Sequence, residues 1–370
     1  MKKFVVKPKI IFDKNPLTYL RTLDHKRFFI VADPFLKENN GLERIVEEIG
    51  EREYKVFSEI VPDPPAQIVA KGIAEIQSFK PDCVVAVGGG SAIDTAKAVV
   101  YYGKLKEIKF IAIPTTSGTG SEVTAFSVIT HTEKGVKFPL VSTALIPDVA
   151  ILDTDFVKSV PPAIVADTGM DVLVHAIEAY VSTASNEFSD AFAEKAIRLT
   201  WENLYKSYSM PENYTAKDKM HKASLMAGLA FNSASLGLNH ALAHNLGARL
   251  HIPHGRVNAV LLPRIIEFNS GVKSFSCTDI NTCAEKYAQI AKIIGFEGNN
   301  TKILVRKLVT ETEKLIKKLG LPLDFKGCKV KLLDDDVQNI VQGTLADNCI
   351  NTNPVRVTEE DVENIINILR

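Results

Sequence analysis

The histidines of this chain are concentrated in one short segment. Four of the eight lie within the fifteen residues from 240 to 254, at positions His240, His244, His251 and His254. A fifth, His175, follows Asp171 by four residues, a spacing that puts both side chains on one face of a helix. One carboxylate with several imidazoles suits Fe²⁺, Zn²⁺, Co²⁺ or Ni²⁺ better than Mg²⁺ or Ca²⁺. The sequence therefore predicts a transition-metal site, although a single histidine is more often an ordinary hydrogen-bonded residue.

Spacing alone leaves open which of the four later histidines bind the metal. His240 and His244 are four residues apart and share a predicted helix. We expect Pro253 to end that helix pattern, so that His254 returns to the site from a loop and Gly255 permits an unusual backbone path. A metal held in this way could polarise a carbonyl or alkoxide oxygen. The alternative is a structural metal with a closed coordination sphere.

Two loops rich in glycine, serine and threonine follow predicted strands. Gly88-Gly89-Gly90-Ser91 opens a helix, whose N–H groups and dipole could hold a pyrophosphate. It is neither the GxGxxG fingerprint nor a Walker P-loop, so a plain strand–helix turn is the alternative. The second loop, residues 114–122, offers five hydroxyl groups. Because ligands of parallel sheets bind beyond the carboxyl ends of the strands, both loops are predicted to bind one nucleotide.

Asp33 lies just past the first predicted strand, at the same edge of the sheet. Its carboxylate could accept hydrogen bonds from ribose hydroxyls and would repel a 2′-phosphate, which favours NAD over NADP. The alternative interpretation is a turn or N-cap residue before Pro34.

The order of predicted elements divides the chain of 370 residues into two domains. Residues 1–160 alternate apolar runs with helical stretches such as 67–79, which predicts a doubly wound α/β domain. After Pro161-Pro162, long amphipathic patterns predict an all-helical domain over residues 161–370. The expected strands are residues 28–32, 55–60, 83–87, 110–113 and 148–153, and the later helices include 190–206, 217–231 and 303–319.

Composition excludes several classes of function. The formal net charge is zero, so no basic field favours nucleic acid. No segment approaches the roughly 20 apolar residues of a membrane span. Five scattered cysteines without a CxxC pair indicate neither a disulfide framework nor a zinc ribbon. A cytoplasmic protein is expected.

Several motifs resemble those of the iron-dependent (group III) alcohol dehydrogenases, in order and over nearly the whole chain. They are the segments Gly88–Lys97, Pro114–Glu122, Gly169–Tyr180, His240–Gly247 and Ala346–Pro354. Within that family, residues 62–65 and 168–171 are most similar to the propanol dehydrogenases of 1,2-propanediol-utilising microcompartments. The resemblance implies a Rossmann-like parallel-sheet nucleotide-binding domain and a helical metal-binding domain, as in dehydroquinate synthase-like folds, with the active site between them.

The resemblance also implies roles for individual residues. Asp171, His175, His240 and His254 match the family's metal ligands, His251 falls outside the motif, and His244 matches a non-ligand histidine linked to substrate and proton relay. Val128, Phe231 and Cys349 match residues that line the family's alcohol pocket. Phe126 stands where a related lactaldehyde reductase has an asparagine, and this apolar replacement favours an apolar aldehyde over a diol as the substrate. The positions that match NAD contacts are Asp33, Gly89, Gly90, Ser91, Asp94, Thr115, Thr116, Thr119, Thr124 and Lys137.

The expected activity is hydride transfer between NAD(H) and a short-chain primary alcohol or aldehyde of the propanol type. Fe²⁺ is the expected metal, with Zn²⁺ as the alternative. His244 is expected to return the proton. Cys349 is expected to form part of the pocket wall, or to be simply a small buried residue. The alternatives are 1,3-propanediol, butanol or lactaldehyde dehydrogenases, a zinc glycerol dehydrogenase, and a dehydroquinate synthase-like enzyme. A non-enzymatic rival is a metal-stabilised shell-cargo protein. A homodimer without nucleic acid or membrane partners is expected, in the cytoplasm or as microcompartment cargo.

Overall fold

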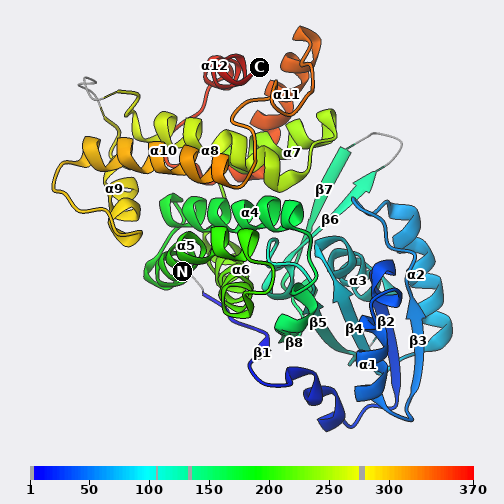
Figure 1. Ribbon diagram of the computed structural model, residues 1–370. Coiled ribbons are helices and arrows are strands. Elements are labelled where there is room, and N and C mark those ends of the chain that lie inside the picture. The colour runs from blue at the N-terminus through cyan, green and yellow to red at the C-terminus, as the bar shows by residue number, and fades with distance from the viewer. Residues whose placement is uncertain (1–3, 106, 132–135, 275–279) are drawn as a thin grey trace. The chain divides into compact units, whose positions relative to one another are not determined.

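The computed structural model describes residues 4–105, 107–131, 136–274 and 280–370 (Figure 1). The chain forms two compact units, one of Val5–Val160 and the other of Pro161–Arg370 together with Phe4. The Phe4 ring explains its place in the second unit, because it stacks on Phe188 and Phe192 at 5.6 and 5.8 Å. No described helix is long and apolar enough to span a bilayer.

The first unit contains a six-stranded sheet in which every pair of neighbouring strands is parallel. The five predicted strands are all present, and the predicted α/β fold is confirmed. The short strand β1 was not predicted, because its three residues carry no long apolar run. In spatial order the strands are β1 (Lys9–Ile11), β8 (Val149–Ile151), β5 (Lys109–Pro114), β4 (Cys83–Gly88), β2 (Arg27–Ala32) and β3 (Glu53–Phe57).

Helical elements cover both faces of this sheet. Along β2, Phe28 and Ile30 belong to a core with α1 (Gly41–Ile49) and η1 (Pro16–Thr22). The alternate residues Phe29 and Val31 belong to a second core with α2 (Ala66–Phe79) and α3 (Gly90–Gly103). Burial on both faces is why the strands are continuously apolar instead of alternating.

A separate two-stranded antiparallel sheet follows β5 in the chain. Its strands are β6 (Phe126–His131) and β7 (Val136–Val141), with Val128 opposite Pro139. These strands were not predicted. Their residues mix polar and apolar side chains and include a proline, which is typical of an edge strand and gives only a weak strand signal.

Within the residues that the structure describes, the second unit is all-helical, as predicted. Its central helix, α4 (Pro162–Val181), is buried along nearly its whole length from Val165 onward and contacts α5, α6 and α8. A helix surrounded in this way is usually apolar on all sides, so the polar residues that α4 buries require specific partners. The other helices are α5 (Glu187–Ser209), α6 (Tyr214–Ala234), α7 (Leu238–Leu250), α8 (His254–Ser270), α9 (Ala284–Ile293), α10 (Thr301–Lys318), α11 (Asp334–Ala346) and α12 (Glu359–Leu369).

Candidate functional site

The buried polar side chains of α4 lie on one face of that helix. Asp171, His175 and Glu178 are spaced by four and three residues, and each is at most 5% exposed. The first helical residue is Pro162, which is compatible with an N-terminal position because its missing N–H would have no partner there. The predicted carboxylate–imidazole pair is therefore held on a buried helix.

The path from His240 to His254 differs from the expected one. Helix α7 carries His240 and His244 and ends at Leu250, before Pro253, but His254 does not lie on a loop. It is the first residue of α8, because Pro253 occupies the N-cap position and a new helix starts directly after it. The expectation that His254 returns from a loop is wrong.

Gly255 also serves a different purpose from the expected one, because it has no unusual backbone conformation and lies within α8. A Cβ atom there would lie 2.1 Å from the carbonyl oxygen of Asp167, so glycine permits α8 to approach α4 closely. Arg256 fixes the same contact by donating two hydrogen bonds to the Asp167 carboxylate, at 3.1 and 3.0 Å.

Three of the four predicted ligands converge in the helical unit. The ligand atoms of Asp171, His240 and His254 all lie within 4.8 Å of one another. Oδ1 of Asp171 is 3.7 Å from Nε2 of His240 and 3.6 Å from Nε2 of His254. The fourth, His175, has Nδ1 at 3.9 Å from Oδ2 of Asp171 and stacks its ring on His240, with centroids 4.5 Å apart.

The ring of His240 is oriented for metal binding by a carboxylate behind it. Oε2 of Glu178 lies 2.5 Å from Nδ1 of His240, so the ring proton belongs on Nδ1 and the lone pair of Nε2 faces Asp171. A carboxylate that holds the far nitrogen of an imidazole is the usual support of a metal-binding histidine. The donors present therefore fit a divalent transition metal.

The charges of this cluster shift its pKa values. Burial by itself would lower the pKa of His240, but hydrogen bonds and charge interactions with Asp171 and Glu178 raise it to about 9. Burial would likewise raise the pKa of Asp171, yet His175, His254 and His240 together hold it well below its ordinary value. A metal ion bound at this cluster would compete with a proton for the lone pair of Nε2 of His240.

His244 lies next to this cluster but has a different partner. Its ring stacks on that of His254, with centroids 5.4 Å apart, and its Nδ1 is 2.8 Å from Oδ2 of Asp347. Its side chain is one-third exposed, whereas that of His240 is buried. Asp347 fixes the tautomer of His244 and leaves its Nε2 available for proton transfer.

The four predicted pocket residues fall in different units. Phe231 stacks on His175 at 4.5 Å, and a ligand atom of Cys349 lies within 4.8 Å of those of His244 and Asp347. Burial, followed by the charges of Asp347 and Glu178, raises the pKa of Cys349 well above its ordinary value, so this thiol is protonated. Phe126 and Val128 belong to the first unit, two residues apart on one face of β6.

In the first unit, the two predicted nucleotide loops lie against each other at the ends of β4 and β5. A Cβ atom on Gly90 would lie 2.8 Å from Cγ2 of Thr119, and one on Gly89 would lie 3.5 Å from Oγ1 of Thr116. The backbone N–H of Thr115 donates to the carbonyl oxygen of Gly88 at 3.0 Å. Gly89 is the N-cap of α3, so the N-terminus of a fourteen-residue helix lies beside these threonines.

Asp33 joins the same loops. It precedes the short helix η2 (Pro34–Lys37), but its side chain does not cap that helix. Its Oδ2 instead accepts the backbone N–H of Gly89 at 2.7 Å. Burial raises the pKa of Asp33 and the Gly89 N–H opposes this shift. The N-cap alternative therefore does not describe how this carboxylate is used.

Asp94 and Thr124 are tied into the protein by hydrogen bonds of their own. The two carboxylate oxygens of Asp94 accept from the Ser121 hydroxyl at 2.6 Å and the Val128 backbone N–H at 2.9 Å. Nζ of the fully buried Lys97 donates to the carbonyl oxygen of Thr124 at 2.8 Å and to that of Phe126 at 2.7 Å. The last predicted cofactor contact, Lys137, is in β7, and its side chain lies outside the described residues.

Sequence reasoning missed the residues that support the histidines. Glu178 could have been found, because it follows Asp171 by seven residues and His175 by three, on the same helix face. Asn258 follows His254 by one helical turn in the same way. Asp347 gave no such signal, because it is 103 residues from the histidine that it supports.

Both units match one family along nearly their whole length. The profile described as "Iron-containing alcohol dehydrogenase" matches residues 8–154, and that described as "Fe-containing alcohol dehydrogenase family, C-terminal" matches residues 165–369. The chain belongs to the iron-containing alcohol dehydrogenase family. It is therefore an oxidoreductase enzyme, as the resemblance of its motifs had predicted.

Two relatives illustrate the range within the iron-containing alcohol dehydrogenases. A 1-propanol dehydrogenase, PduQ, of Citrobacter freundii is 41% identical over 96% of each chain. An NADPH-dependent butanol dehydrogenase of Clostridium saccharobutylicum is 36% identical over 99% of this chain and 97% of its own. The family thus includes members that use the phosphorylated nicotinamide cofactor.

Two solved structures share the fold over the full length of this chain. A 1,3-propanediol oxidoreductase superposes with a TM-score of 0.91 at 32% identity, covering 100% of both chains. A sulfoacetaldehyde reductase of Bifidobacterium kashiwanohense in complex with NAD⁺ has a TM-score of 0.87 at 28% identity, covering 100% of this chain and 98% of that one.

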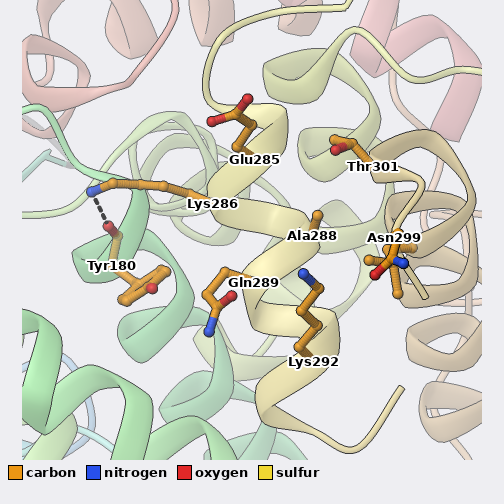
Figure 2. Close-up of a pocket in the computed structure, with 9 residues that line it drawn as sticks. Tyr180, Glu285, Lys286, Ala288, Gln289, Lys292, Asn299 and Thr301 are labelled. Atoms are coloured by element: carbon orange, nitrogen blue, oxygen red, sulfur yellow. Dashed lines mark hydrogen bonds between the residues drawn. The ribbon is translucent and has the colours of Figure 1, made fainter. Parts of the chain in front are cut away.

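A separate pocket of about 400 Å³ in the helical unit is lined largely by α9. Figure 2 shows Lys286 reaching from that helix to the backbone carbonyl oxygen of Tyr180, and Nζ also donates to Oγ of Ser185. No predicted catalytic, metal or substrate residue lines it. The ammonium group of Lys286 is already paired. The pocket is distinct from the histidine cluster, because none of the cluster's residues lines it.

Proposed function

We propose that this enzyme transfers hydride between NAD(H) and a short-chain primary alcohol or aldehyde, using a divalent metal with Fe²⁺ preferred over Zn²⁺. The proposal rests above all on the convergence of Asp171, His240 and His254, with Glu178 fixing the ring of His240. His175 completes the proposed ligand set from the same helix as Asp171. A bound divalent cation supplies the positive charge that polarises a carbonyl oxygen.

The protein's own residues contribute position and proton transfer. We assign His244 as the acid–base group, because it lies beside the metal ligands, is partly exposed and has its Nδ1 held by Asp347. Phe231 and the protonated thiol of Cys349 give the neighbouring surface an apolar character. Apolar walls favour an alkyl aldehyde over a diol.

We assign cofactor binding to the unit Val5–Val160 and metal binding to the helical unit. Support for the first assignment comes from the helix N-terminus at Gly89, the threonines beside it and the carboxylate of Asp33. A buried negative charge at Asp33 disfavours a 2′-phosphate, so we propose NAD as the preferred cofactor. The proposed contacts include the loop residues Gly89, Gly90, Ser91, Thr115, Thr116 and Thr119, together with Asp94, Thr124 and Lys137.

Propanol and propionaldehyde are the proposed substrates, because a 1-propanol dehydrogenase is 41% identical to this chain. Dehydrogenases of 1,3-propanediol and butanol are the nearest alternatives, given the relatives with those activities. The homodimer and the microcompartment location remain predictions.

Metal analysis of anaerobically purified enzyme, paired with NADH and NADPH oxidation on C2 to C4 aldehydes, tests the proposal. We expect one iron per chain and oxidation of NADH that is fastest with an unsubstituted alkyl aldehyde. Metal-dependent thermal stabilisation without oxidation of either cofactor on any aldehyde would instead support a structural metal and refute the proposal.

A further inference from the structure

One side-chain amide contacts all three converging ligands. Asn258 lies one helical turn after His254 on α8 and is fully buried. Its Nδ2 donates to Oδ1 of Asp171 at 2.7 Å and lies 3.2 Å from Nε2 of His240 and 3.1 Å from Nε2 of His254. The nitrogen of one neutral amide therefore lies within hydrogen-bond distance of all three predicted ligand atoms, and its two N–H bonds can serve two of them at a time.

The other end of this amide faces a second buried asparagine. Oδ1 of Asn258 accepts from Nδ2 of Asn239 at 2.8 Å. Oδ1 of Asn239 is buried, and among the residues that the structure describes it has no hydrogen-bond partner. The backbone N–H of Asn239 is held at 2.7 Å by Oε1 of Glu178, so this residue is tied to the same network. A buried acceptor without a donor is costly and requires an explanation.

An amide that presents hydrogens to the ligands cannot keep that orientation beside a cation, because its N–H dipoles would point at the positive charge. A half-turn about the terminal torsion of Asn258 exchanges its oxygen and nitrogen at little steric cost. The nitrogen would then face Asn239, whose Oδ1 could accept from it after the same half-turn. The exchange gives the unpartnered oxygen of Asn239 a donor. It breaks the hydrogen bonds from Asn258 to Asp171 and from Asn239 to the backbone carbonyl oxygen of Asn258, so it requires the attraction between the cation and the Asn258 oxygen.

We propose that Asn258 is a further protein group of the metal site, and that Asn258 and Asn239 reverse their amides together when the cation binds. In the metal-free protein the two amide N–H bonds hold Oδ1 of Asp171 and Nε2 of His254 in place. In the loaded protein Oδ1 of Asn258 faces the cation, and Asn239 stabilises that orientation. The inference rests on the metal site of the proposed function.

Cobalt binding to the full-length protein tests this inference without an activity measurement. The readouts are the Co²⁺ dissociation constant, from chelator competition, and the visible absorption of bound Co²⁺, which reports its coordination. We expect Asn258→Ala to bind Co²⁺ about 10- to 100-fold more weakly and to change the spectrum. Unchanged or tighter binding would overturn the proposal, because it would mean that the amide only packs there or competes with the metal.

Asn239→Asp is a second variant, which tests the two orientations of the Asn258 amide and replaces Asn258→Ala if that variant does not fold. An ionised aspartate at 239 carries only acceptors, so it holds the Asn258 nitrogen toward itself and leaves the oxygen facing the ligands. We expect a lower thermal midpoint without metal and tighter Co²⁺ binding than in the wild type. Equal or weaker binding would contradict the reversal.

Asn269→Ala is the matched control, because Asn269 is a buried asparagine eleven residues further along the same helix. It bonds to Tyr287 and Asn353 instead of the metal ligands, so its loss should lower stability and leave the Co²⁺ constant and spectrum unchanged. Wild-type protein that binds no Co²⁺ would refute the proposed function itself. Wild-type binding with an Asn258→Ala constant equal to that of the control would refute only the role of Asn258.

Discussion

Glu178 and His240 form the closest carboxylate–imidazole pair of the histidine cluster, with Oε2 of the acid 2.5 Å from Nδ1 of the ring. The same carboxylate accepts the backbone N–H of Asn239 at 2.7 Å through Oε1. One buried acid on α4 thus fixes both the tautomer of a predicted ligand and the first turn of the helix that carries it.

Replacing this acid should weaken the metal site without removing a ligand. In Glu178→Gln the amide can donate to Nδ1 of His240, which would move the ring proton to Nε2 and block the lone pair. We expect metal affinity to fall by about 10- to 100-fold, measured by chelator competition. Glu194→Gln is the control, because that acid accepts from the Tyr180 hydroxyl instead of a histidine. Equal affinities of both variants would exclude the supporting role of Glu178.

His244 should be essential for turnover and dispensable for metal retention. We expect His244→Gln to lower kcat by about 100-fold or more, because a positioned acid–base group contributes that much. The metal content measured on the same preparation should stay at the wild-type level. Asp347→Asn should reduce kcat less, since it disturbs only the tautomer. If His244→Gln lost its metal, the histidine would be a ligand and not the proton donor.

Asp33 should determine the choice of nicotinamide cofactor. Removing the charge and volume in Asp33→Gly should raise the ratio of kcat/KM for NADPH to that for NADH by about tenfold or more, since about 1.4 kcal/mol of relieved repulsion corresponds to that factor. Asp33→Asn keeps the size and separates charge from volume. An unchanged ratio in both variants would show that Asp33 supports the loop through the Gly89 N–H alone.

Glu122 should make stability depend on pH. Burial raises the pKa of this carboxyl to about 7, against weaker opposing effects of a hydrogen bond from its own backbone N–H and of the Lys97 charge. A raised pKa favours the protonated form in the folded state, so its stabilising contribution is complete below about pH 4.5 and is lost as the pH rises through about 7. Glu122→Gln stays neutral, so its thermal midpoint should match the wild type near pH 4.

The difference should appear above neutral pH. Near pH 8 we expect Glu122→Gln to be the more stable protein by something on the order of 3 kcal/mol. The comparison requires thermal unfolding of both proteins at each pH. A constant difference between pH 5 and pH 8 would mean that Glu122 does not titrate in this range.

Local patterns predicted most of the elements. The strand Cys83–Gly88 and the helix Thr301–Lys318 were predicted to within two residues, because apolar runs and helical periodicity are properties of neighbouring residues. The hairpin of β6 and β7 was missed, since its stability depends on pairing that its mixed composition does not reveal.

The second helix after Pro253 was missed for a similar reason. A proline ends one helix and can begin another, and only the following residues' packing decides between them.

The sequence by itself predicted a metal-binding chemistry for the histidine segment. Helical spacing fixes which side chains share a face. It therefore predicted a transition-metal site from the types and positions of Asp171, His175, His240 and His244. Tertiary structure alone decided their partners. It brought α4, α7 and α8 together, so that Glu178 orients His240, Asp347 orients His244 and Asn258 contacts three predicted ligands at once. Hydrogen bonds between residues distant in sequence depend on packing, which no local spacing encodes.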